Sequence, residues 1–164
     1  MTNIENEFYN ANEAFEYFYK YISKYGTDFR DTKTLFNVGF AIHKPMLNVI
    51  VTEQRKWSKE YAEAEWQWYL SGDNHIKTLG DIYGKVPEIW KRMADDRGYV
   101  NSNYGWQWQR QKQLDKVISL LKRDKYTRQA AISIYDAKEF DEYTNDTPCT
   151  YAVQFTIVDN RLHM

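Results

Sequence analysis

The hydrophobic period of the chain changes from helical to strand-like in its second half, and this change limits the folds open to it. Residues 130–135 and 149–158 read as β-strands, and the second alternates between two faces with a period of two. Before them, residues 111–123 carry apolar side chains at the spacing of a helix with one buried face, at Leu114, Val117, Ile118 and Leu121. We therefore expect an α/β chain of the α+β type, with helices that flank a mixed or antiparallel sheet.

The first part of the chain adds elements of both kinds. Residues 12–25 have the apolar spacing of another amphipathic helix, which we expect to end at Gly26. Two β-favouring runs, TLFNVGFAI and MLNVIV, lie within 33–51, and a further helix is predicted for 57–70. With 164 residues and no repeats or linkers, the chain is expected to form a single domain over 1–164.

The last residues read as a hairpin that is cut short. Asp159 and Asn160 tolerate the positive φ angles of a tight turn, and residues 161–164 begin a second alternating strand. The return strand of a hairpin usually has about five residues or more, so we expect a C-terminally incomplete sheet. A short edge strand at the end of the chain is the alternative.

Charge and composition argue against several partners. The net charge of −1 gives no electrostatic reason to expect nucleic acid, and no apolar run approaches the roughly 20 residues that span a membrane. A single cysteine rules out an internal disulfide and is typical of a reducing compartment. The first residues, MTNIENEF, lack the pattern of a secretory signal, so we expect a cytoplasmic protein.

Glu65 falls in the middle of an apolar arc on the helix predicted for 57–70. A carboxylate on such a face is desolvated, which favours its neutral form and lets it exchange protons near neutral pH. The alternative is a glutamate at the edge of a helix interface that pairs with a lysine or extends into solvent. The other members of the arc are Tyr61, Ala62, Ala64, Trp68 and Tyr69.

Cys149 opens the strand predicted for 149–158 and is the single cysteine of the chain. A lone cysteine in such a position is usually a small buried apolar residue. A nucleophilic role requires a thiol that ionises readily and hence a cationic neighbour, for which Arg128 and Arg30 are the candidates. The three histidines have no spacing typical of metal ligands, so no metal site is expected.

Four segments, in this order along the chain, resemble the thymidylate synthase superfamily. NSNYGW within the second segment is most similar to the deoxynucleotide hydroxymethylase branch, and the order and spacing hold from about Thr32 to Met164. The resemblance implies a thymidylate synthase-like domain that lacks the C-terminal part of the fold, since family members continue past this end. The four segments are EWQWYLSGDNHIKTL (65–79), IWKRMADDRGYVNSNYGWQW (89–108), YTRQAAISIY (126–135) and TPCTYAVQF (147–155).

The resemblance also implies roles for single residues. Cys149 matches the family's nucleophile, and Glu65 matches its proton-relaying glutamate. Tyr104 matches the tyrosine of a water network near carbon 5 of the pyrimidine. Trp90 matches the tryptophan that lines the folate and nucleotide pocket. The expected catalytic residues are therefore Cys149, Glu65 and Tyr104.

Two arginines match the family's phosphate-binding residues less completely. Arg128 matches an arginine that one subunit of a homodimer donates to the nucleotide phosphate of its partner, but Gln129 stands where a second arginine is usual. Arg30 lies one position away from a phosphate-binding arginine of the N-terminal loop. The resemblance thus implies a homodimer with one cation fewer at the phosphate.

The implied reaction is one-carbon transfer from 5,10-methylenetetrahydrofolate to carbon 5 of a pyrimidine deoxynucleoside monophosphate, dUMP or dCMP. Thr150 follows the cysteine where methyl-forming members usually carry histidine, which slightly favours a hydroxymethyl product. Because the match stops before further functional residues of the family, we expect little or no activity from this chain alone. The hydroxymethyl branch typically serves viruses, which would place such a protein in the host cytoplasm.

Two other functions stay open at this point. One is a non-catalytic remnant that dimerises or binds a nucleotide. The other is a hydrolase on the same scaffold, in which Glu65 activates water against the glycosidic bond. Release of the base without folate would indicate the hydrolase.

Overall fold

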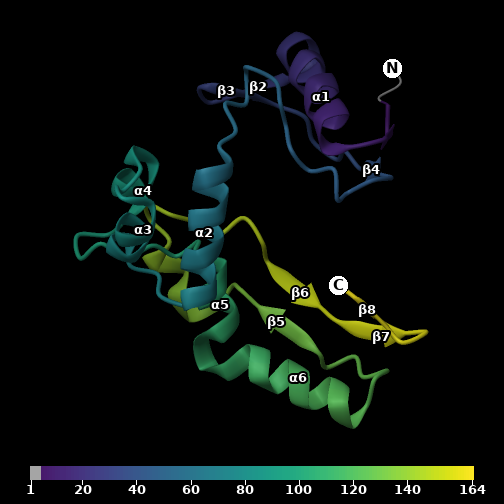
Figure 1. Ribbon diagram of the computed structural model, residues 1–164, viewed down its shortest axis with the longest axis vertical. Helices are drawn as coiled ribbons and strands as arrows, with labels where there is room; N and C mark the ends of the chain where they lie inside the picture. The colour runs from purple at the N-terminus through teal and green to yellow at the C-terminus, as the bar shows by residue number, and fades with distance from the viewer. Residues whose placement is uncertain (1–4) are drawn as a thin grey trace. The chain divides into compact units, whose positions relative to one another are not determined.

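The computed structural model describes residues 5–164 (Figure 1). The chain divides into two compact units, one ending at Ser58 and one running from Lys59 to Met164. Each unit combines helices with small pieces of sheet, which confirms the α+β class. The single domain expected over 1–164 stays a prediction.

The first unit contains one long helix, α1 (Ala11–Tyr25). The side chain of Asn10 caps its first turn by accepting the Glu13 backbone N–H at 2.9 Å. The helix ends at Gly26, so the prediction for this segment is confirmed to within one residue. The strands of the unit form a parallel pair, β1 with β4, and an antiparallel hairpin, β2 with β3. They are β1 (Glu7–Phe8), β2 (Thr27–Phe29), β3 (Thr32–Thr34) and β4 (Ala41–Ile42).

The prediction of strands within residues 33–51 is mostly wrong. The run TLFNVGFAI contributes only its ends to β3 and β4, and residues 46–51 form a loop instead of a strand. Their side chains are largely exposed, with Met46 at 88% and Val51 at 77%. β-branched residues favour a strand only where a neighbouring strand and a buried face are available, and residues 46–51 have neither among residues 5–58.

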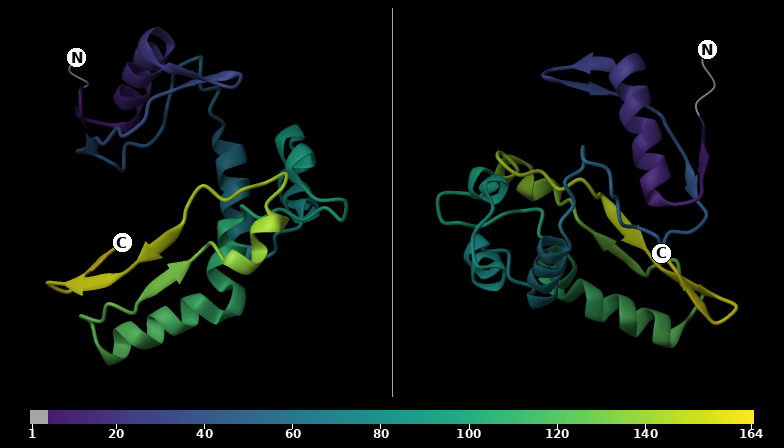
Figure 2. Two further views of the ribbon diagram at one scale, coloured as in Figure 1. Left: turned by 180° about the vertical axis from the view of Figure 1, so that it is seen from behind. Right: turned by 45° about the horizontal axis from the view of Figure 1, so that its top comes forward.

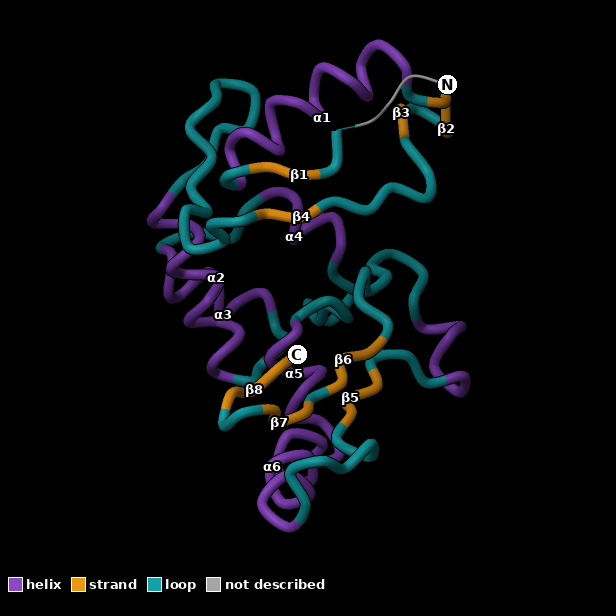
Figure 3. Tube along the Cα trace, turned by 90° about the vertical axis from the view of Figure 1, so that its right-hand side faces the viewer, coloured by secondary structure: helices purple, strands orange, loops and turns teal. Residues whose placement is uncertain are grey.

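The second unit holds the remaining elements, and Figures 2 and 3 show how short its strands are beside its helices and loops. Its α-helices are α2 (Lys59–Ser71), α3 (Ile76–Tyr83), α4 (Glu88–Met93), α5 (Tyr104–Gln109) and α6 (Gln113–Arg123). Two 3₁₀ turns are η1 (Arg110–Lys112) and η2 (Ala137–Glu142), and the strands are β5 (Ala131–Ser133), β6 (Ala152–Gln154), β7 (Thr156–Val158) and β8 (Arg161–His163).

The strand predicted for 149–158 is divided in two. β6 pairs antiparallel with β5, while β7 pairs antiparallel with β8. Between them, Phe155 donates its backbone N–H to the Ala130 carbonyl at 2.8 Å and turns its ring into the core. The hairpin turn is confirmed, since Asp159 and Asn160 have φ angles of 50° and 57°.

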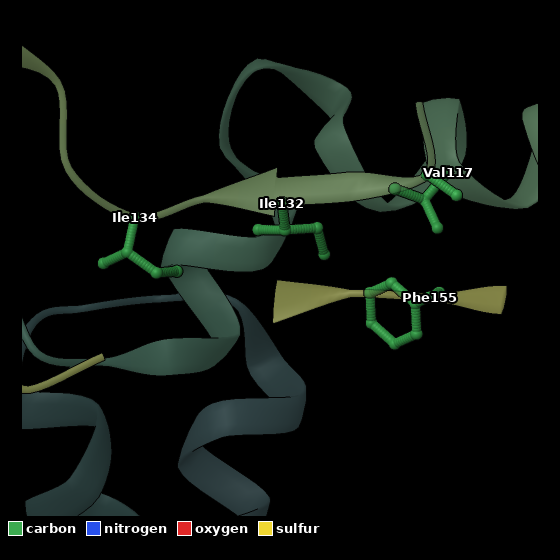
Figure 4. Packing of buried hydrophobic residues seen from close by; sticks show 5 residues of the cluster. Val117, Ile132, Ile134 and Phe155 are labelled. Carbon is green, nitrogen blue, oxygen red and sulfur yellow. The ribbon is translucent and has the colours of Figure 1, made fainter. Parts of the chain in front are cut away.

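Two clusters of buried side chains stabilise the second unit. One lies between α6 and the strands, where Val117, Ile132, Ile134 and Phe155 meet (Figure 4). The other contains Ala64, Trp68, Leu79 and Val100 and lies against α2 and α3. Helix α6 thus buries Val117 and packs Leu114 and Leu121 against the same cluster, as its apolar spacing predicted, whereas Ile118 is 42% exposed. Helix α2 buries Ala64 and Trp68 of its predicted apolar arc.

The three short helices between residues 72 and 110 have no counterpart in the sequence-based assignment. They have six to eight residues each, too few for a clear helical period. Two of them begin at capping side chains, because His75 accepts the Lys77 N–H and Asn103 accepts the Trp106 N–H.

Gly105 fixes how closely α5 approaches α2, and this gives a testable prediction. A Cβ at this position would lie 1.6 Å from the Tyr69 carbonyl oxygen, which belongs to the α2 backbone and cannot rotate away. We expect Gly105→Ala to lower the free energy of unfolding by about 3 kcal/mol, because the two helices must separate. Urea titration monitored by circular dichroism measures the change.

Gly39→Ala is the matched control for this substitution. A Cβ at Gly39 meets no atom within 4 Å, so this variant should unfold within about 0.5 kcal/mol of the wild type. Equal unfolding midpoints for the two variants would contradict the close helix contact.

Candidate functional site

Glu65 lies on α2 in a hydrogen-bonded group of three side chains. One turn earlier on the helix, the Tyr61 hydroxyl donates to Glu65 Oε1 at 2.6 Å. The same hydroxyl oxygen accepts the indole N–H of Trp90, in α4, at 2.7 Å. The Trp90 ring also meets the Trp68 ring edge to face, with centroids 5.2 Å apart. Two of the residues named from the sequence, Glu65 and Trp90, are therefore joined through Tyr61.

Burial controls the ionisation of the tyrosines around Glu65. It raises the pKa of Tyr61 well above the ordinary tyrosine value, and the hydrogen bond to Glu65 raises it further. Burial also raises the pKa of Tyr69, and the charge of Glu65 adds to this effect. Both hydroxyls are therefore protonated at neutral pH, so Tyr61 is available as a donor to the glutamate.

Tyr104 begins α5 and holds the backbone at Cys149. Its hydroxyl oxygen accepts the Cys149 N–H at 2.9 Å and the Thr150 N–H at 3.3 Å. On the other side of the cysteine, the Tyr135 hydroxyl donates to the Pro148 carbonyl at 2.6 Å. Cys149 itself is exposed, so it is not the small buried apolar residue that its sequence context allowed.

Tyr69 connects the glutamate to Tyr104. It lies one turn after Glu65 on α2, and its ring meets the Tyr104 ring edge to face with centroids 6.1 Å apart. The charges of both neighbours contribute, after burial, to its raised pKa. Cys149, Tyr104 and Tyr69 therefore form a series of contacts, and Glu65 lies one turn before Tyr69 on the same helix. From the sequence, Tyr69 is predicted only as a member of the apolar arc.

The two phosphate-binding candidates lie away from this series. Arg128 is exposed and precedes β5 at the end where Ala131 pairs with Gln154, whereas Cys149 precedes the opposite end of β6. Arg128 is thus no neighbour of Cys149 within the chain. Arg30 is exposed in the turn between β2 and β3 of the first unit, with a φ of 56°.

A cleft of about 650 Å³ lies beside the Cys149 loop. Asp146, three residues before the cysteine, forms part of its wall together with side chains from the segments that precede and begin α5. Its volume is in the range of sites for small organic ligands. The other lining residues include Asn74, Met93, Asp95, Arg97, Tyr99, Asn101 and Trp106.

Residues 5–164 contain neither a membrane-spanning helix nor a cluster of metal-binding side chains. No helix in this part of the chain is long and apolar enough to cross a membrane. The same residues hold no group of three His, Cys, Asp or Glu side chains that could bind a metal ion.

The family model for thymidylate synthase matches residues 18–164. The chain therefore belongs to the thymidylate synthase family, which confirms the resemblance carried by its four segments.

Relatives with two different names match the chain about equally well. Thymidylate synthase of Buchnera aphidicola is 35% identical over 104 residues, which cover 58% of this chain and 38% of the relative. Deoxycytidylate 5-hydroxymethyltransferase of Enterobacteria phage T4 is 34% identical over 112 residues, which cover 63% of this chain and 44% of the relative. The chain thus spans less than half of the length of these curated relatives.

Two solved structures share the fold. Thermostable thymidylate synthase A from Bacillus subtilis aligns with a TM-score of 0.50 and 24% identity, covering 66% of this chain and 40% of that one. Thymidylate synthase from T4 phage aligns with a TM-score of 0.52 and 22% identity, covering 69% and 44%. At this level of identity, the likeness shows the fold alone.

The raised pKa of Tyr61 predicts a loss of stability at alkaline pH. Unfolded tyrosines ionise near pH 10, while burial keeps Tyr61 protonated in the folded chain to higher pH. The stabilisation that the half-buried, protonated Tyr61 gives to the folded chain is therefore complete below about pH 10 and decreases as the pH rises further. Between about pH 9 and pH 11, the free energy of unfolding should fall by about 0.5 kcal/mol less in Tyr61→Phe than in the wild type. The difference is this small because the ring is only half-buried.

Urea unfolding at several pH values measures this difference. Tyr126→Phe changes a ring that is 66% exposed and should follow the wild-type curve. Parallel curves for the wild type and Tyr61→Phe would show that burial does not hold the proton of Tyr61.

Proposed function

We propose that this chain belongs to an enzyme that transfers one carbon from 5,10-methylenetetrahydrofolate to carbon 5 of a pyrimidine deoxynucleoside monophosphate. The observation that carries the proposal is the exposed Cys149, whose backbone is bound to the Tyr104 hydroxyl. An exposed thiol on a fixed backbone is suited to attack a bound substrate. Membership of the thymidylate synthase family supports the same chemistry.

Cys149 supplies the nucleophile. The thiol releases its proton to solvent, the thiolate sulfur bonds to carbon 6 of the pyrimidine, and the electrons of the 5,6 double bond move toward the ring carbonyl. Carbon 5, a poor nucleophile in the free base, thereby becomes able to form a bond to a one-carbon unit. Tyr104 keeps the cysteine backbone in place through its contact with the Cys149 and Thr150 N–H groups.

Glu65 moves protons for the reaction. Its carboxyl group gives a proton to the ring oxygen as the negative charge develops there, and takes it back later. Tyr61 orients the carboxyl group by donating to Oε1, and Trp90 fixes Tyr61 in turn. Glu65 thus presents its other oxygen in a defined direction.

The residues around the cleft fit a reduced folate. Such a molecule combines a polar bicyclic ring, an aromatic ring and a carboxylate, and its binding needs amides, aromatic faces and a cation. When bound, it supplies the one-carbon unit. The cleft lining contains side chains of these kinds in Asn74, Asn101, Tyr99, Trp106 and Arg97. The NH₂ group of Asn101 already binds loop carbonyls and Arg97 pairs with Asp95 at 3.2 Å, so a folate would meet the Asn101 amide oxygen and would share Arg97 with Asp95.

The product is proposed to be hydroxymethylated rather than methylated, with dCMP and dUMP both retained as substrates. Thr150 follows the nucleophile, and its small side chain leaves room for water at this point. The phage T4 relative carries the name of a hydroxymethyltransferase, while the Buchnera relative carries that of a synthase.

The assembly is proposed to be a cytoplasmic homodimer in which Arg128 serves the partner's site. Because Arg128 is exposed and lies at the far end of the β5–β6 pair from Cys149, it is placed to reach a neighbouring subunit rather than its own nucleotide. Arg30 is the second phosphate ligand proposed.

An intact-mass measurement tests the proposed function. The chain is incubated with methylenetetrahydrofolate and, in separate tubes, with 5-fluoro-dUMP or 5-fluoro-dCMP. Fluorine at carbon 5 cannot leave as a proton does, so a working site retains a covalent complex. Since the chain spans less than half of the length of its relatives, we expect only a small fraction of it to gain the mass of nucleotide plus folate, in one of the two tubes, and that tube identifies the base.

Cys149→Ser is the matched control and should gain no mass, because it lacks the attacking sulfur. An unmodified mass in both tubes, from wild-type protein that is folded by circular dichroism, would contradict transfer by this chain alone. Release of free base without folate would support the hydrolase instead.

A further inference from the structure

Asp146 is a buried carboxylate in the loop that leads to Cys149. It is only 7% exposed. Its two oxygens accept the backbone N–H of Ser102 at 2.7 Å and the Ser102 hydroxyl at 2.5 Å. A buried carboxylate is costly to desolvate unless it is hydrogen-bonded, and charge-assisted bonds of this length are strong. The loop is therefore firmly bound to the chain at Ser102.

Asn101 extends this contact along the same loop. Its side-chain amide donates to the Glu142 carbonyl at 3.1 Å and to the Asp146 carbonyl at 3.0 Å. Two consecutive residues before α5 thus bind the backbone and side chain of the loop. The segment before α5 and the loop before the cysteine are aligned over several residues.

The same two segments meet again at the candidate nucleophile. Tyr104, two residues after Ser102, accepts the N–H groups of Cys149 and Thr150, which follow Asp146 by three and four residues. A three-residue connection spans at most about 10 Å, so the Asp146 contact limits where Cys149 can lie. Binding at one point therefore favours binding at the other.

No strand pairing holds Cys149 in place of these contacts. Hydrogen bonding to the β5 segment begins at Tyr151, whose carbonyl accepts the Ile134 N–H at 2.9 Å, and regular pairing begins at Ala152. The Cys149 backbone N–H instead donates to the Tyr104 hydroxyl. Apart from the bond between the Tyr135 hydroxyl and the Pro148 carbonyl, the position of the thiol thus depends on how firmly the loop is aligned with residues 101–104.

We propose that Asp146 is a positioning residue, which acts through Ser102 to hold Cys149 on the Tyr104 hydroxyl. The functional part of this inference rests on Cys149 being the nucleophile, as proposed above. Small displacements of a reacting group lower rates steeply, so loss of the Asp146–Ser102 contact slows attack by the thiol. Asp146 does not touch the reacting atoms in this scheme.

Amide hydrogen exchange tests the positioning role without any reaction. In Asp146→Ala, the Cys149 and Thr150 N–H groups should exchange about ten- to one-hundredfold faster than in the wild type, the factor that corresponds to one charge-assisted hydrogen bond. NMR measures both groups directly. Asp146→Asn should restore slow exchange, because its amide oxygen can accept from the Ser102 N–H while its NH₂ donates to the hydroxyl.

Asp141→Ala is the matched control, since it removes an exposed carboxylate from the same part of the chain. Its Cys149 and Thr150 N–H groups should exchange at the wild-type rate. Tyr104→Phe removes the hydroxyl that accepts both N–H groups, so its exchange rates give the largest acceleration that loss of this contact can cause. Wild-type exchange in a folded Asp146→Ala protein would overturn the proposal.

Ser102→Ala keeps the test decisive if Asp146→Ala does not fold. It removes only the hydroxyl that donates to Asp146, and cooperative thermal unfolding checks its fold. Exchange at Cys149 and Thr150 should again accelerate, by about tenfold. An unchanged rate here would equally reject the positioning role.

The covalent complex separates this inference from the proposed function. Where the wild type forms the fluoropyrimidine complex, Asp146→Ala should form it at least about tenfold more slowly at saturating nucleotide, with Asp146→Asn close to the wild type. Faster exchange together with an unchanged rate of complex formation would refute the functional part. A wild type that forms no complex rejects the proposed function, while hydrogen exchange still decides whether Asp146 positions Cys149.

Discussion

The hydroxyl of Tyr104 is the point on which the rest of the candidate site depends. It accepts two backbone N–H groups from the loop that carries the thiol, and its ring lies against Tyr69 of α2. The place of Tyr104 is itself fixed by the start of α5, where Asn103 caps the helix and Gly105 allows the Tyr69 carbonyl to approach. A backbone contact between α2 and α5 thus determines where a side chain of α5 can hold the nucleophile, which lies on a third segment.

Long periodic segments made part of the fold predictable. The helices expected at 12–25 and 111–123 form at 11–25 and 113–123, because a repeating apolar face needs a core whatever the surroundings. The strand expected at 46–51 does not form, since β-favouring composition supplies no partner strand. The helices between residues 72 and 110 depend on caps and on contacts with α2, which a short pattern does not reveal.

The candidate site, too, was predictable from the sequence only in part. Glu65 was visible as a carboxylate on an apolar arc, and the family resemblance named Trp90, Tyr104 and Cys149. The partners that orient these residues were not visible, because a hydrogen bond such as that from Ser102 to Asp146 joins positions 44 residues apart. The chemistry available to a residue follows from its type, whereas the orientation of its side chain follows from the tertiary structure.

The Trp90–Tyr61–Glu65 group fixes the direction in which the Tyr61 hydroxyl donates. An indole nitrogen can donate a hydrogen bond but cannot accept one, so the Trp90 N–H occupies the Tyr61 oxygen and turns the hydroxyl hydrogen toward Glu65. Tyr61 is therefore held as a donor to the glutamate rather than as an acceptor from it. An indole in α4 thus sets the orientation of a carboxyl group on α2 through a single hydroxyl, so the packing of α4 against α2 and the direction of the Glu65 carboxyl group are one and the same structural feature.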